Sequence, residues 1–127
     1  MASLSDLVLT LEQTQIQRKL KTVTIIYEYT LNCSGVECDE AQPWQVSVDI
    51  LGDDVLVDDK LALDADAHGV VCRRLPGGVH MVRKFVVGQS LLDEDVGDDE
   101  IKLTIRVRNE QGEELCSGTT GIVRGNF

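Results

Sequence analysis

Seven consecutive residues, from Ile101 to Val107, alternate apolar and polar side chains without a fault. The apolar positions are 101, 103, 105 and 107, and the polar positions are 102, 104 and 106. A period of two predicts a β-strand that turns one face to a core and the other to solvent. The stretch before it, 93–100, is rich in carboxylates and predicts a solvated loop. We therefore expect the rest of the chain to supply further strands around this one.

Several other stretches carry the same alternation. Residues 22–33 are dense in β-branched and aromatic side chains, which favours a strand over a helix. Shorter alternating stretches are 6–12, 44–51 and, more weakly, 61–68. Residues 70–87 are predicted to form a hairpin, because Leu75-Pro76-Gly77-Gly78 suits a type II turn. Residues 114–127 are predicted to return as a last, glycine-rich strand, and no window shows helical periodicity.

The number and spacing of these strands predict the fold class. Seven or eight short strands within 127 residues, with no linker or repeat, are typical of a single all-β domain. The pattern resembles an immunoglobulin-like or fibronectin-type antiparallel β-sandwich, with Trp44 near the start of the third strand and a very regular penultimate strand. A closed β-barrel, with an internal cavity for a small molecule, is the alternative.

The net charge of −10 limits the classes of partner. So acidic a surface repels nucleic-acid phosphates and anionic lipid, so we expect neither a nucleic-acid nor a membrane partner. No apolar run approaches the ~20 residues of a membrane span. The N-terminal residues do not show the basic segment followed by an apolar segment that is typical of a secretory signal peptide. We therefore expect no secretory signal and a cytoplasmic location.

The four cysteines fit more than one state. Cys33 and Cys38 bracket a short predicted loop and could close a small disulfide if oxidised. Cys72 and Cys116 fall in strand-like sequence and are expected to be small buried side chains. In a reducing compartment, free thiols are the expected state.

Clustered acids on predicted loops raise the possibility of a calcium site, because Ca²⁺ prefers oxygen ligands. The residues that would supply them are Asp53, Asp58, Asp93, Asp95 and Asp98. A second stretch, 64–69, resembles the start of a calcium-binding loop but has Leu75 where a bidentate glutamate is needed. Acids at turns also solvate loops and discourage edge pairing, so we keep calcium as an alternative and expect no obligatory cofactor.

Catalytic signatures are weak. A base beside a nucleophile would have to come from His68 or His80, with Cys72 and Ser90 the nearest nucleophiles. The sequence has no nucleophile elbow, phosphate-binding loop or dinucleotide fingerprint. The spacing of the cysteines and histidines departs from the usual structural zinc patterns. We therefore predict a protein that is not an enzyme.

Charges of both signs occur at different places in the sequence. Arg73, Arg74, Arg83 and Lys84 lie on the arms of the predicted hairpin. The acidic loop offers Asp93, Asp95, Asp98 and Asp99. Because surfaces of opposite charge can join copies of one chain, the leading prediction is a protein-interaction or structural module. We expect it to form homo-oligomers through these charges or to capture another protein.

Overall fold

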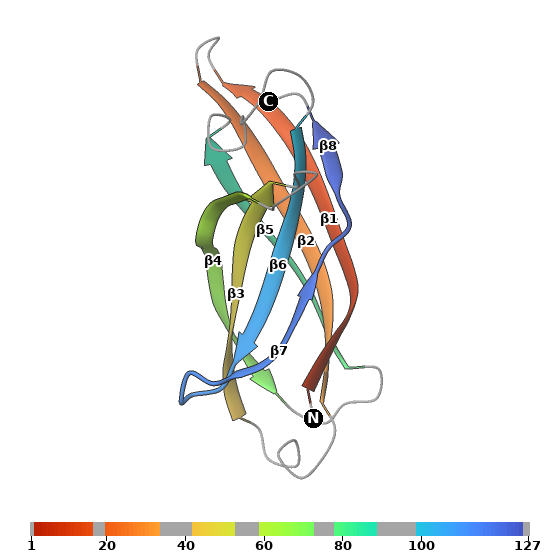
Figure 1. Ribbon diagram of the computed structural model, residues 1–127, viewed down its shortest axis with the longest axis vertical. Helices are drawn as coiled ribbons and strands as arrows, with labels where there is room; N and C mark the ends of the chain where they lie inside the picture. The colour runs from red at the N-terminus through yellow and green to blue at the C-terminus, as the bar shows by residue number, and fades with distance from the viewer. Residues whose placement is uncertain are drawn as a thin grey trace.

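The computed structural model describes residues 2–16, 20–33, 42–52, 59–72, 78–88 and 99–125. These residues form eight β-strands, which are β1 (Ala2–Ile16), β2 (Leu20–Cys33), β3 (Gln42–Gly52), β4 (Asp59–Cys72), β5 (Val79–Gly88), β6 (Asp99–Arg108), β7 (Glu114–Thr119) and β8 (Val123–Gly125). One sheet has the strand order β1-β2-β5 and the other β4-β3-β6-β7, with β8 also paired to β6. The sheets pack as two layers (Figure 1). The predicted all-β sandwich is confirmed.

Strand β6 lies inside its sheet, as its regular alternation predicts. It pairs with β3 along one edge, while β7 and β8 pair with successive parts of the other edge. Its four apolar side chains, at 101, 103, 105 and 107, are completely buried. Burial of each contributes roughly 1.5–3 kcal/mol to stability relative to exposure. The strand is therefore a central element of the hydrophobic core.

The core fills the space between the two sheets. Strand β2 contributes five buried side chains at alternate positions, which are Val23, Ile25, Tyr27, Tyr29 and Leu31. Strand β3 faces them with four more, which are Trp44, Val46, Val48 and Ile50. Both sets match the faces that the sequence predicts. The two tyrosines carry hydroxyl groups into this interior, where they need hydrogen-bond partners.

The first two strands are longer than the alternation alone predicts. Strand β1 continues to Ile16, which pairs with Leu20 at the start of β2. The polar residues near this hairpin obscured the period of two in the sequence. The register of the pair shifts between Ser5 and Val8, and Asp6 there has a φ of 53°. A short polar side chain tolerates this left-handed conformation better than most.

The predicted hairpin over residues 70–87 is wrong. Strand β4 pairs with β3, whereas β5 pairs with β2, so the two arms belong to different sheets. The chain therefore passes from one layer to the other between β4 and β5. Gly78 ends this connection with a φ of 77°, and a Cβ there would lie 2.7 Å from the carbonyl oxygen of Leu31. Only glycine fits this position without strain.

The C-terminal stretch forms two short strands where the sequence predicts one. Strand β7 leaves β6 after Thr119, and Thr120 turns back to β6 by exchanging hydrogen bonds with Leu103. Strand β8 then resumes the pairing. The glycines at 118 and 121 weaken any continuous strand here, because they lack a side chain to pack.

The described strands do not close into a barrel. The three-stranded and five-stranded sheets remain separate layers, so the alternative with an enclosed barrel cavity is wrong. The part of the chain that the structure describes also holds no helix long and apolar enough to cross a membrane.

Candidate functional site

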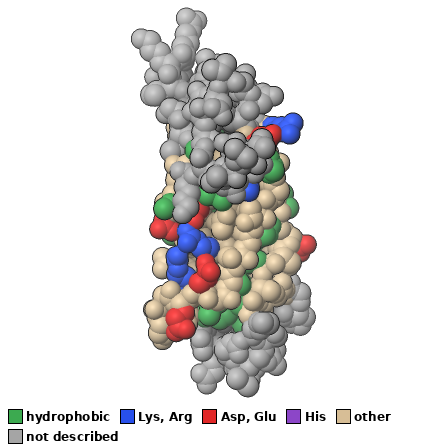
Figure 2. All heavy atoms as spheres, in the orientation of Figure 1, with side chains coloured by type: hydrophobic (Ala, Val, Ile, Leu, Met, Phe, Trp, Pro, Cys, Tyr) green, Lys and Arg blue, Asp and Glu red, His purple; other side chains and the backbone are tan. Residues whose placement is uncertain are grey.

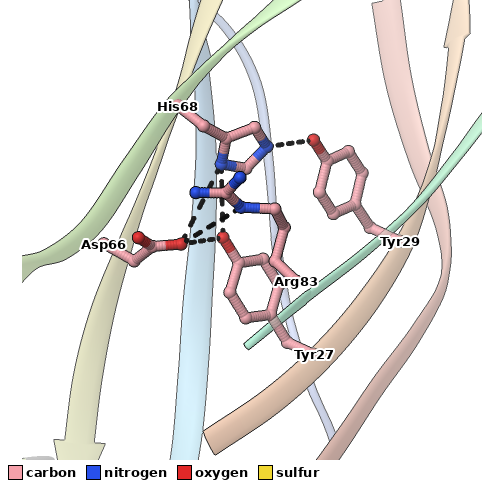
Figure 3. Close-up of polar contacts among 5 residues, drawn as sticks. All are labelled: Tyr27, Tyr29, Asp66, His68 and Arg83. Atoms are coloured by element: carbon pink, nitrogen blue, oxygen red, sulfur yellow. Dashed lines mark hydrogen bonds and ion pairs between the residues drawn. The ribbon is translucent and has the colours of Figure 1, made fainter. Parts of the chain in front are cut away.

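Five polar side chains meet between the sheets, at the side of the sandwich formed by the edge strands β4 and β5. Tyr27 and Tyr29 come from β2, Asp66 and His68 from β4, and Arg83 from β5 (Figure 3). The side chain of His68 is 6% exposed and that of Asp66 is 15% exposed, whereas Arg83 reaches the surface at 37%. We call this group the tyrosine–histidine cluster.

Short contacts connect the members of the cluster. The Tyr27 hydroxyl donates to the Asp66 carboxylate at 2.5 Å. The Tyr29 hydroxyl lies 2.6 Å from Nε2 of His68, and the Tyr27 hydroxyl lies 3.3 Å from Nδ1 of the same ring. Nε of Arg83 lies 3.6 Å from the Asp66 carboxylate, which makes an ion pair across the gap between the sheets.

One arrangement of protons satisfies these contacts. Because Tyr27 donates its proton to Asp66, its oxygen is available to accept from Nδ1 of His68. Nε2 of a neutral ring that carries its proton on Nδ1 then accepts from Tyr29. The hydrogen bonds therefore run in one direction, from Tyr29 through His68 and Tyr27 to the carboxylate. This requires His68 to be neutral.

The electrostatics of the site favour the same protonation state. Burial lowers the pKa of His68 below its usual 6.5, and the Arg83 cation lowers it further. Burial also raises the pKa of Tyr29 to about 12. Burial and the hydrogen bond to Asp66 raise the pKa of Tyr27 still more. At neutral pH the histidine and both tyrosines therefore carry no charge.

This arrangement suits structure better than catalysis. A nucleophilic tyrosine needs a lowered pKa and a general base needs access to a substrate proton. Here both tyrosine pKa values are raised, and both ring nitrogens of His68 already contact tyrosine hydroxyls. What the cluster does is bridge β2, β4 and β5, which belong to different sheets. It ties the two layers together at one side.

A second polar network stabilises a bulge in β4. Asp49 of β3 is buried, and its carboxylate accepts hydrogen bonds from Arg106 and from the backbone N–H of Asp64. Asp64 has a φ of 50°, and the β3–β4 register shifts on both sides of Ile50. The carboxylate thus holds the bulge at a backbone conformation that is otherwise unfavourable.

The predicted basic hairpin is not brought together at the two positions that can be checked. Arg83 points into the sandwich, whereas Lys84 is exposed on the opposite face of β5. The sequence held a signal for this: Arg83 shares its alternation with Val79, Met81, Phe85 and Val87, so it belongs to the inward face. Arg73 and Arg74 lie outside the described residues.

The predicted acidic sites lie almost wholly outside the described part of the chain. This holds for Asp53, Asp58, Asp93, Asp95 and Asp98. Asp99 is described as the first residue of β6, where its backbone pairs with Gly125. Within the described ranges, no three acidic, histidine or cysteine side chains gather in a way that could hold a metal ion. The calcium alternative stays a prediction.

The expectation of free thiols is wrong for Cys33, which is disulfide-bonded. This residue ends β2, where the predicted loop to β3 begins. The predicted cytoplasmic location stays a prediction.

Apolar side chains stand exposed on the outer face of the β1-β2-β5 sheet. Val8 is 45% exposed, Val82 55% and Val86 60%. Val8 and Val82 flank Glu28 of β2, and Ile26 lies diagonal to all three valines. These four side chains therefore share one outer face of the sheet, at diagonal spacings of about 7–8 Å, with Glu28 and Lys84 among them. We call it the valine face.

Charged side chains elsewhere on the surface are mixed. On the face toward the viewer in Figure 2, basic and acidic groups of the described residues lie beside one another. The ion pair between Arg124 and Glu100, at 2.9 Å, is one such contact. Exposed pairs of this kind contribute little to stability. They give this face no single sign of charge.

A surface pocket of about 280 Å³ lies at one end of the five-stranded sheet. Its lining comes from the start of β3, from β4 and from the turn after β6, and consists of Pro43, Trp44, Gln45, Gly69, Asn109 and Glu110. None of these residues belongs to the tyrosine–histidine cluster. The pocket therefore gives that cluster no access to a ligand.

The fold and site define an antiparallel β-sandwich domain with an internal polar tie. No protein-family model matches the chain, and no curated protein matches its sequence. Solved structures give weak likenesses: a β-glucosidase 3B from Thermotoga neapolitana in complex with glucose has 14% identity and a TM-score of 0.43, over 98% of this chain and 16% of the other. A β-glucosidase from Kluyveromyces marxianus has 9% identity and a TM-score of 0.35, over 94% and 15%.

The chain thus spans less than a fifth of the length of either β-glucosidase. Likenesses at these TM-scores carry no argument about what this chain does.

Proposed function

We propose that this domain is a non-catalytic interaction module that acts by associating with protein, in the first instance with copies of itself. The observation that supports the proposal is that the polar cluster lies in the interior of the domain, whereas apolar side chains lie on its surface. The tyrosine–histidine cluster is turned inward and internally hydrogen-bonded, while three valines stand exposed on one outer face. Exposed apolar groups that cluster on a surface commonly mark protein contacts.

The acidic and basic segments predicted from the sequence belong to the same proposal. A chain of charge −10 repels its copies unless local charges of opposite sign meet. Arg73, Arg74 and Lys84 on the basic side, and acidic residues near 93–99, would supply such contacts. This charge-driven contact is screened by salt, because the Debye length falls to about 3 Å at 1 M.

Light scattering at increasing protein concentration, in low and in high salt, tests the proposal. We expect a mass that rises above the 14.0 kDa of one chain. A fall in mass at high salt would assign the association to charges, and an unchanged mass would assign it to apolar contacts. A mass of one chain at every concentration and salt would contradict self-association.

A further inference from the structure

We propose that the valine face is the surface through which two copies of this chain form a two-fold dimer. The inference rests on the proposed function and names its contact surface. Its occupant is a second copy of the same face, because the face carries in itself the groups that a self-complementary contact requires.

The apolar side chains of the face alternate with two charged ones, Glu28 and Lys84. Ile26 sits on the middle strand, with Val8 on one side and Val82 and Val86 on the other. Each valine stands on an outer strand and is close to half exposed or more. Against an identical face, these side chains would lose water together, which is the main source of free energy in protein association.

The charges of the face complement each other between copies. Lys84 of β5 pairs across the sheet with Ile26, and Glu28 of β2 pairs with Val82. Lys84 and Glu28 are therefore diagonal neighbours in the β2–β5 pair. Within the described residues, neither Lys84 nor Glu28 forms an ion pair in its own chain. A two-fold axis parallel to the face can set Lys84 of each copy against Glu28 of the other and form two equivalent pairs.

The size of the face is close to the lower limit for a specific dimer. Strand β5, the shortest of the three, has ten residues. Three strands spaced about 4.8 Å apart, with ten residues rising about 3.4 Å each, cover roughly 14 by 34 Å. Two such faces together cover roughly 1,000 Å², close to the lower limit for a specific interface. The predicted dimer is therefore of modest affinity and depends on concentration.

Sedimentation velocity over a range of concentrations tests the inference with four variants. Val82→Glu places a second carboxylate on the face, beside Glu28 of β2, and should raise the dimer dissociation constant by about tenfold or more. Val71→Glu is the matched control, because Val71 is 47% exposed on β4 of the other sheet. It should leave the dissociation constant unchanged. Circular dichroism confirms that both variants keep their fold.

A charge exchange provides the second arm. Lys84→Glu alone should weaken the dimer, and combination with Glu28→Lys should restore it, with the net charge of the wild type. If the wild type dimerises but Val82→Glu and Lys84→Glu leave its dissociation constant unchanged, the valine face is not the interface, although self-association stands. If the wild type is monomeric at every concentration, self-association itself fails.

Discussion

The hydrogen bond from Tyr27 to Asp66 should contribute more to stability than the bond from Tyr29 to His68, although the two tyrosines are neighbours on one strand. Tyr27 donates to an ionised carboxylate at 2.5 Å, whereas Tyr29 contacts a neutral ring nitrogen at 2.6 Å. Hydrogen bonds to charged groups contribute about 1.5–3 kcal/mol and neutral ones about 0.5–1.5 kcal/mol. Replacement of each tyrosine by phenylalanine removes the hydroxyl and keeps the ring.

Tyr27→Phe should therefore lower the free energy of unfolding by about 2 kcal/mol, and Tyr29→Phe by about 1 kcal/mol. Asp66 keeps its ion pair with Arg83 in the first variant, which prevents a larger loss. For a urea m-value of about 2 kcal/mol/M, Tyr27→Phe would lower the midpoint by about 1 M. Both proteins are compared by urea denaturation at one protein concentration, because the proposed dimer would make the midpoint depend on concentration.

If both variants keep the wild-type m-value, a loss of unfolding free energy for Tyr27→Phe no larger than that for Tyr29→Phe would contradict the stronger hydrogen bond to the Asp66 carboxylate. A changed m-value would show instead that the native or unfolded state had changed in compactness.

The other predictions concern pH, the turn and the core. Because the pKa of His68 is lowered in the folded state, the unfolded chain binds more protons below pH 6.5. The free energy of unfolding therefore falls as the pH drops through that window. The difference in unfolding free energy between wild type and His68→Gln should become smaller over the same range. A difference that does not change between pH 7.5 and 5 would count against a neutral, buried His68. Gly78→Ala should destabilise the protein more than Gly112→Ala. Both positions have a positive φ, which costs a residue with a Cβ about 1–2 kcal/mol. At 78 the added Cβ would also clash with the Leu31 carbonyl oxygen, whereas at 112 it would meet nothing within 4 Å. Equal losses in thermal melts would contradict the close approach at 78. In chemical denaturation, Ile105→Ala should lower the free energy of unfolding by about 2–5 kcal/mol, and Val86→Ala by less than about 0.5 kcal/mol. Similar losses in the two variants would contradict the inward position of Ile105 and the outward position of Val86.

Most of the fold prediction depends on the alternation of apolar and polar residues along the strands. It identifies β6 and the buried face of β2, because both strands have one wholly apolar side and burial then determines which side faces inward. The predicted pairing of residues 70–87 fails because a turn sequence specifies that the chain reverses, and leaves open which sheet the next strand joins. That choice is made by contacts distant in sequence, such as Val82 beside Glu28.

The same alternation predicts part of the candidate site. Tyr27, Tyr29 and Arg83 each fall on an inward face by alternation, so their burial could have been predicted. Their meeting with Asp66 and His68 could not, since it depends on β4 and β5 lying at the same side of two different sheets. The prediction of a basic hairpin joins Arg83 to Lys84 because the two are adjacent in sequence, but adjacent residues of a strand point to opposite faces.

The association surface can be observed directly through the methyl groups of the valines, in heteronuclear NMR spectra of the full chain recorded at low and high protein concentration. We expect the methyl signals of Val8, Val82 and Val86 to shift with concentration, while those of the exposed Val71 on the other sheet stay in place. Shifts confined to Val71, or constant signals throughout a concentration range in which the measured mass doubles, would contradict the proposed dimer surface.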